Sequence, residues 1–150
     1  MIAFLALAPC CIFAQEPTVA SLFREMPDSL MPYLTKNNRL DMLDFMEARM
    51  KAEVTNLFDA KSEMTALSAD SLSIRMSDVL TVDMHIARVA EPIDSSNVTI
   101  LLRRTYRINE SQAECVVDVY TSAWRHLSSR LESSSLLKRD DEIFLHPVQR

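Results

Sequence analysis

Three arginines, Arg103, Arg104 and Arg107, form the densest basic cluster of the chain, within the segment LLRRTYR. Guanidinium groups hold carboxylates and phosphates by paired hydrogen bonds, so this cluster could bind an acidic partner. The alternative is the solvated face of an edge strand, where charge discourages aggregation. The single tryptophan, Trp124, lies beside Arg125 and is a second candidate binding residue, because exposed tryptophans anchor many interfaces. A tryptophan that closes one end of the core is the alternative for this position.

The other reactive side chains show no catalytic pattern. His85, His126 and His146 lie far apart in the sequence, without the HExxH or HxH spacing of a zinc site. Cys115 lies in the apolar segment ECVVDVY, which indicates a buried cysteine rather than a reactive thiol. The sequence therefore predicts no catalytic residue, no metal site and no cofactor. A hydrolase remains an alternative, in which His85 or His126 meets carboxylates only in the folded chain.

The chain contains no glycine. Phosphate-binding loops, dinucleotide-binding fingerprints and nucleophile elbows all use glycine at a tight turn or a close backbone approach. These motifs are therefore excluded in their standard form. Turns that need a positive φ must use Asn or Asp instead, and we expect them at Asn37, Asn38, Asn97 and Asn109.

The overall composition is that of one globular domain. The 150 residues are 48% hydrophobic and 25% charged, and the formal net charge is −5. Nucleic-acid-binding proteins carry a basic stripe or patch, and this chain has only the one short arginine cluster. We therefore expect no nucleic-acid partner.

The first fourteen residues, MIAFLALAPCCIFA, are uncharged and almost wholly apolar. A membrane-spanning helix needs about 20 such residues, so the run is too short to cross a bilayer. It predicts a signal peptide over 1–14 that lacks the usual basic start. We therefore expect an exported protein, periplasmic or extracellular, with no integral membrane segment after cleavage. A buried N-terminal element, or a lipid anchor on Cys10 or Cys11, is the alternative.

Apolar periodicity predicts helices followed by strands. Thr18 is expected to cap a short helix that Pro27 ends, and Asn37 or Asn38 to cap a longer one that runs toward Phe58. After Lys61 the apolar residues alternate, which is typical of antiparallel strands with one wet face. The predicted strands are MTAL, LSIRM, TVDMHIARV, NVTILLRRTY and AECVVDVY, with EPIDSSN and RINESQ as connections.

The expected fold class is therefore α+β, with N-terminal helices packed on one face of an antiparallel β-sheet built from hairpins. A single α+β domain is expected over 15–127. The remainder, 128–150, is rich in serine and charge and predicts a divergent or loosely packed tail, in which EIFL is a candidate for a last strand.

The segment LFREMPDSLMPYLTKNNRLDMLDFM, followed by KSEMTALSADSLSIRMS, resembles a family of uncharacterised exported proteins of anaerobic gut bacteria. The family is known only as a domain of unknown function, and the resemblance extends from about Leu22 to Val89. It continues weakly through TYRINES and YTSAW. It implies an exported protein with a signal peptide, and it assigns no catalytic residue.

These observations favour a non-enzymatic binding or accessory protein of the bacterial envelope, with another envelope protein as its partner. The Pro-bracketed turn MPDSLMPYL is interpreted as a corner that orients two helices rather than as a binding surface. The sequence leaves the oligomeric state open.

Overall fold

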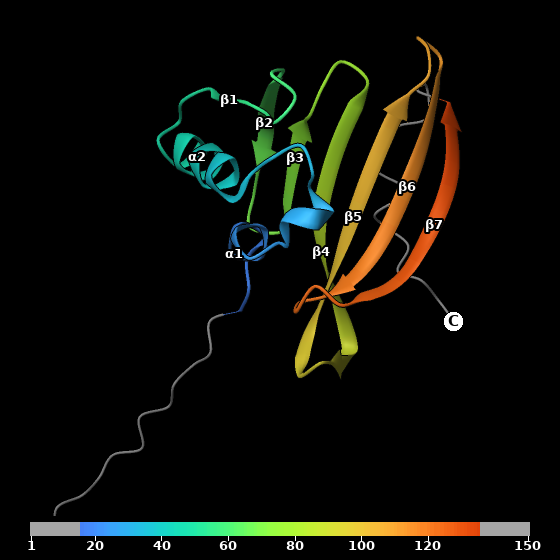
Figure 1. Cartoon of the computed structure of the whole chain (residues 1–150). Coiled ribbons are helices and arrows are strands. Elements are labelled where there is room, and N and C mark those ends of the chain that lie inside the picture. Colours follow the sequence, from blue (N-terminus) through green and yellow to red (C-terminus); the bar gives the residue numbers. More distant parts are fainter. Residues whose placement is uncertain (1–15, 136–150) are drawn as a thin grey trace, which may run out of the picture.

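The computed structural model describes residues 16–135, which form two α-helices, a 3-10 helix and seven strands (Figure 1). In chain order these are α1 (Val19–Arg24), η1 (Asp28–Leu30), α2 (Lys36–Glu47), β1 (Ala52–Thr55), β2 (Lys61–Leu67), β3 (Ser71–Arg75), β4 (Leu80–Ile93), β5 (Ser96–Arg107), β6 (Gln112–Thr121) and β7 (His126–Ser135). All strands lie in one antiparallel sheet, in the order of the sequence. The predicted α+β class and antiparallel sheet are confirmed. The predicted signal peptide and the EIFL segment lie outside the described residues.

Both α-helices begin with a capping box. Thr18 accepts a hydrogen bond from the Ser21 N–H at 3.2 Å, as predicted for the start of α1. The cap of α2 is Thr35, whose hydroxyl accepts from the Asn38 N–H at 3.1 Å. The prediction that Asn37 or Asn38 caps this helix is wrong, because Asn38 occupies the third helical position and bonds back to the Thr35 N–H.

Helix α2 ends at Glu47, so the prediction that it runs toward Phe58 is wrong. Arg49 adopts a left-handed conformation, with φ of 56°. The N–H groups of Arg49 and Met50 then bond to the carbonyls of Met46 and Phe45, which is the Schellman pattern of a helix end. The chain continues as β1, in which Val54 is buried by the alternation of a strand rather than by a helical stripe.

Arg49 is at a position that glycine would occupy more easily. A left-handed conformation costs a residue with a Cβ about 1 kcal/mol or more, and glycine avoids that cost while gaining entropy in the unfolded chain. Arg49→Gly is therefore expected to raise the free energy of unfolding by about 0.5–1 kcal/mol relative to Arg49→Ala, measured by urea denaturation. A glycine variant no more stable than the alanine variant would contradict this reading of the helix end.

Positive φ values occur at other turns as well, but none of them is at a predicted asparagine. The remaining positive φ values belong to Asp59, Asp94, Ser95 and Trp124. Asn37 and Asn38 lie instead in the first turn of α2, and Asn97 lies within β5. Asn109 organises its turn through its side chain, which accepts a hydrogen bond from the Ser111 N–H at 3.0 Å.

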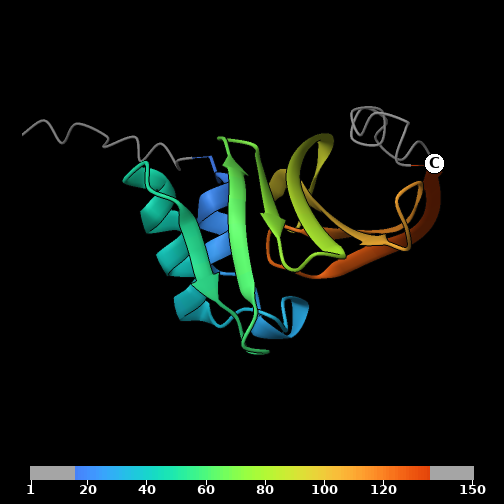
Figure 2. The same ribbon diagram turned by 90° about the horizontal axis from the view of Figure 1, so that it is seen from above.

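The core lies between the helices and the first five strands. On β4, Leu80, Val82, Met84 and Ile86 are buried and alternate with more exposed residues, as the sequence predicts. They form one hydrophobic cluster with side chains of the helices, such as Phe23 of α1, which is fully buried. Figure 2 shows α1 and α2 beside the first strands of the sheet, whereas β6 and β7 curve away from them.

Strands β1 and β7 are not predicted by the sequence. β7 pairs with β6 from His126 to Ser135, with a register shift near its start. The strand therefore continues beyond Leu127, at which the predicted domain ended. Its sequence, HLSSRLESSS, has little apolar alternation, so backbone pairing rather than side-chain burial places it in the sheet.

The corner between α1 and α2 is organised around one buried arginine. Arg39 is 1% exposed, and its guanidinium donates hydrogen bonds to the carbonyls of Met26 at 2.7 Å and Leu34 at 3.4 Å. It also pairs with Asp28 at 2.8 Å and lies 6.0 Å from the centre of the Phe23 ring. Its Nε has no partner within residues 16–135. The MPDSLMPYL turn is thus held from inside, which fits its interpretation as a structural corner.

Candidate functional site

The three arginines of the predicted basic cluster do not share a surface. Arg103 and Arg104 are adjacent on β5, so their side chains point to opposite faces of the sheet. β5 is paired on both sides, with β4 and β6, and is not an edge strand. Both the predicted cluster and its alternative, a solvated edge, are therefore absent from this part of the chain.

Arg103 lies on the face directed away from α1 and α2. It is 4% exposed and pairs with Asp83 of β4, at 2.8 Å from Nη2 to Oδ2. Asp83 also accepts a hydrogen bond from the Ser73 hydroxyl of β3 at 2.7 Å. The three residues are aligned by strand register, so the charge of Arg103 is engaged within the sheet.

Arg104 lies on the helix face and joins the corner to the sheet. Its guanidinium donates to the carbonyl of Leu30 in η1 at 3.0 Å and forms an ion pair with Asp118 of β6. Asp118 is 8% exposed and also accepts a hydrogen bond from Ser129 of β7 at 2.5 Å. These contacts therefore connect η1 to β5, β6 and β7, and they hold the corner against the sheet.

Trp124, in the β6–β7 turn, packs against one end of the core and does not project into solvent. It is partly buried, its indole N–H donates to the carbonyl of Leu22 in α1 at 3.2 Å, and its ring lies 5.7 Å from that of Tyr120. Burial raises the pKa of the Tyr120 phenol above its usual range, and the nearby Asp118 carboxylate adds to the effect. The arrangement corresponds to the core-closing alternative, and Tyr120 stays protonated near neutral pH.

One group of side chains has the composition of a hydrolase site. His126, Ser129 and Asp118 lie together on β6 and β7, with 2.8 Å between His126 Nε2 and Ser129 Oγ. The order of the contacts, however, is unlike that of a catalytic triad. Ser129 gives its proton to Asp118, so His126 must donate to the serine instead of accepting from it. The serine is therefore not activated as a nucleophile in this arrangement.

His85, the other histidine considered, lies on β4 opposite Ser71 and Leu101. Within residues 16–135, no three His, Cys, Asp or Glu side chains are grouped so that they could hold a metal ion. None of the helices described is both long and apolar enough to pass through a membrane.

One end of the sheet carries exposed apolar side chains. Leu57 and Phe58 are in the β1–β2 turn, Val79 is in the β3–β4 turn, and Ile108 follows β5; their exposed fractions are 61%, 66%, 55% and 56%. Because the strands follow the order of the sequence, these turns lie side by side at one end of the sheet, which is the upper end in Figure 1. We call this surface the apolar end.

The hairpin turns at the opposite end of the sheet do not expose large apolar side chains. Its turns span residues 68–70, 94–95 and 122–125, and none contains a large apolar side chain that is more than half exposed. Two of these turns are joined by an ion pair between Asp94 and Arg125 at 2.9 Å, and this arginine lowers the pKa of the Asp94 carboxyl. Among the hairpin turns of residues 16–135, exposed large apolar side chains are thus found at one end of the sheet, although Met50, before β1, is also exposed.

The apolar end is built on rigid turns. Asn56 is 5% exposed, and its side-chain oxygen accepts hydrogen bonds from the N–H groups of Phe58 and Ala60. The Phe58 ring lies 5.0 Å from Tyr33 of the corner, and the Leu57 N–H donates to the Tyr33 carbonyl. Arg107, the third predicted arginine, donates to the Asp78 carbonyl and so ties the β3–β4 turn to β5.

Sequence reasoning missed the apolar end because Leu57 also fitted the helical period of the preceding segment. The available signal was the position of Leu57 and Phe58 between Asn56 and Asp59. These two residue types favour turns, and large apolar residues within a turn have no core to enter.

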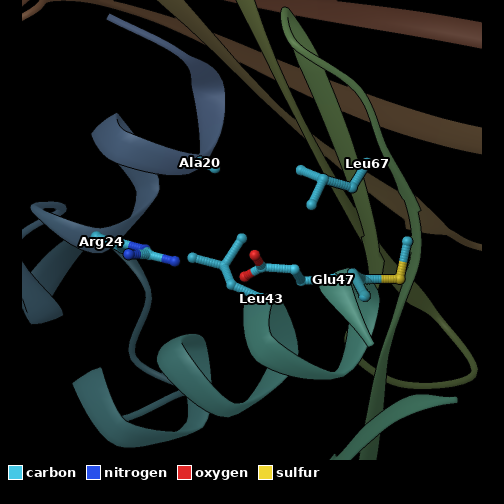
Figure 3. A pocket seen from close by; sticks show the side chains of 6 residues that line it. Ala20, Arg24, Leu43, Glu47 and Leu67 are labelled. Carbon is cyan, nitrogen blue, oxygen red and sulfur yellow. The ribbon is translucent and has the colours of Figure 1, made fainter. Parts of the chain in front are cut away.

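A pocket of about 310 Å³ lies between α1, α2 and β2 (Figure 3). Leu43 and Met46 of α2, Leu67 of β2 and Ala20 of α1 form its apolar lining. Arg24 from the last turn of α1 and Glu47 from the last turn of α2 are its two charged residues.

A family model described as "Protein of unknown function (DUF3256)" matches residues 11–145. Among solved structures, a domain of an uncharacterized protein from Porphyromonas gingivalis is similar, with 24% sequence identity and a TM-score of 0.55. The similarity covers 71% of this chain and 53% of that one, so this chain spans about half of that domain's length. At this identity the likeness concerns the fold alone. No curated protein matches the chain.

Proposed function

This chain belongs to the DUF3256 family of proteins of unknown function, and we propose that it is a non-enzymatic binding protein of the bacterial envelope that holds another protein through its apolar end. The observation that carries the proposal is the exposure of Leu57, Phe58, Val79 and Ile108 in neighbouring turns. The uncharged apolar run at residues 1–14 supports export to the envelope.

The turns of the apolar end lie close enough together for one partner to contact them all. Neighbouring strands lie about 4.8 Å apart, so turns separated by two strands are about 10 Å apart and the row spans about 20 Å. Exposed apolar residues are common when scattered singly, but their presence in three neighbouring turns favours an interaction surface. Arg107 and Asp78 are polar groups at its margin, as at the rim of many interfaces.

The hydrogen bonds that fix the β1–β2 turn also favour a binding role for the apolar end. Association is weakened by the entropy lost when mobile side chains and loops become ordered. The Asn56 hydrogen bonds and the contact with Tyr33 already fix the turn that carries Phe58. A partner would therefore meet a surface whose shape is established before binding.

The test is a cross-linking pull-down from the envelope of the native host with the purified wild-type chain and the variant Phe58→Ser/Ile108→Ser. Truncation of one large apolar side chain in each of the two outer turns is expected to reduce capture of a dominant protein partner by about tenfold or more. Leu131→Ser is the matched control, because Leu131 is 69% exposed but lies on β7, away from these turns.

Circular dichroism would show that all three chains fold. Equal capture by the wild-type chain and the double variant, or equal loss in the Leu131→Ser control, would refute the apolar end as the binding surface. A wild-type chain that captures no protein above background would refute the proposed function itself.

A further inference from the structure

The pocket between α1, α2 and β2 combines an apolar lining with two opposite charges. Leu43, on α2, is 2% exposed, and Met46 and Leu67 are partly buried beside it. Figure 3 shows the side chains of Arg24 and Glu47 directed toward one another, with Leu43 between them. A volume of about 310 Å³ is at the small end of ligand pockets and suits a molecule of amino-acid size.

Arg24 and Glu47 carry the two charges of the pocket, and the contacts that stabilise the fold do not involve their charged groups. Within residues 16–135, neither Arg24 nor Glu47 forms an ion pair or a side-chain hydrogen bond, although other arginines of this domain are closely paired. Both residues line the same cavity, Arg24 from α1 and Glu47 from α2, and both are exposed to solvent. An arginine and a glutamate placed in this way can each accept an opposite charge from one bound molecule.

We propose that this pocket binds an apolar α-amino acid in its zwitterionic form. The carboxylate of the ligand pairs with the Arg24 guanidinium, and its ammonium group pairs with the Glu47 carboxylate. Its aliphatic side chain lies against Leu43, Met46 and Leu67. The site is separate from the apolar end and does not depend on the function proposed above.

The presence of both charges selects against simpler ligands. An apolar acid would satisfy Arg24 but would bring its carboxylate close to Glu47, and an apolar amine would be repelled by Arg24 in the same way. An uncharged apolar molecule would remove water from both charged groups without replacing it by a hydrogen-bonding partner. A zwitterion with an apolar body avoids each of these costs.

The test is a titration of the full chain, labelled with ¹³C at its methionine methyl groups, with L-leucine. The Met46 signal is identified by its loss in Met46→Leu. We expect a saturable shift of this signal, with a dissociation constant at least about tenfold lower than for leucinamide or 4-methylpentanoate. These two compounds lack the carboxylate and the ammonium group respectively, and tenfold corresponds to one lost charge contact of about 1.4 kcal/mol.

Variants separate a specific site from a nonspecific apolar surface. Arg24→Gln and Glu47→Gln should each weaken leucine binding at least about tenfold, and Glu47→Gln should remove the discrimination against 4-methylpentanoate. Glu25→Gln is the control, because Glu25 is exposed and does not line the pocket. No saturable shift with leucine, or equal affinity for all three compounds, would overturn the proposal. Neither result would affect the pull-down through the apolar end.

Discussion

Arg39→Ala is expected to lower the free energy of unfolding by about 3 kcal/mol or more, because it removes the buried centre of the α1–α2 corner. The carbonyls of Met26 and Leu34 lose their guanidinium donor, and each buried group left unsatisfied costs about 1–3 kcal/mol. The substitution also leaves a cavity where a 1% exposed side chain had packed near Phe23. Urea denaturation followed by circular dichroism measures the change.

Two companion variants separate the causes. Arg39→Met keeps most of the side-chain volume but not the donors, so it should be more stable than Arg39→Ala and less stable than the wild-type chain. Asp28→Asn should cost less than about 1 kcal/mol, because the Asp28 side chain is 69% exposed and its ion pair is screened by water. A chain with Arg39→Ala within about 1 kcal/mol of wild type would show that the corner is held by other contacts.

Asp118→Ala is the second substitution with a large expected effect, a loss of about 2–4 kcal/mol at neutral pH. Arg104 then keeps its hydrogen bond to Leu30 but loses its counter-charge in a site where its side chain is only 19% exposed. Ser129 loses the acceptor of its hydroxyl proton at the same time. Ser129→Ala alone should cost only about 1 kcal/mol, since a single hydrogen bond is lost.

A double-mutant cycle isolates the ion pair. If the contact between Arg104 and Asp118 carries the effect, Arg104→Met/Asp118→Ala should be more stable than Asp118→Ala alone, because no partly buried charge is left unpaired, and Arg104→Met completes the cycle. Additive losses in the cycle would contradict this account. A further variant addresses catalysis, since an activity abolished by Asp118→Asn without loss of folding would restore the hydrolase alternative.

The strands were predictable where burial imposes a period of two. The alternation of Val82, Met84 and Ile86 follows from one buried face, and β4 has this pattern in the structure. The end of α2 was not predictable from period alone, because Val54 and Leu57 continue the helical spacing across a break. That break depends on the left-handed conformation of Arg49, a residue type that does not indicate it.

The roles of the arginines could not be read from the sequence for a different reason. Arg103 pairs with Asp83 and Arg104 pairs with Asp118, and both acidic residues are on other strands. Which carboxylate faces which arginine is set by strand register, and register is a property of the whole sheet. A local run of positive charge therefore gave no indication that Arg103 is buried, that Arg104 is partly buried, or that both are paired.

The order of the strands has a consequence for how the chain folds. Within residues 16–135, every strand pairs with the strand that precedes or follows it, so this part of the sheet contains no crossover. The entropy needed to close each hairpin depends on a short turn and grows only slowly with its length. Sheets usually form slowly because distant segments must find one another, but here each strand pairs with its neighbour in the chain, and the sheet is expected to form faster than one with crossovers. A fully extended chain can thus recover this sheet one hairpin at a time, without a search among distant partners.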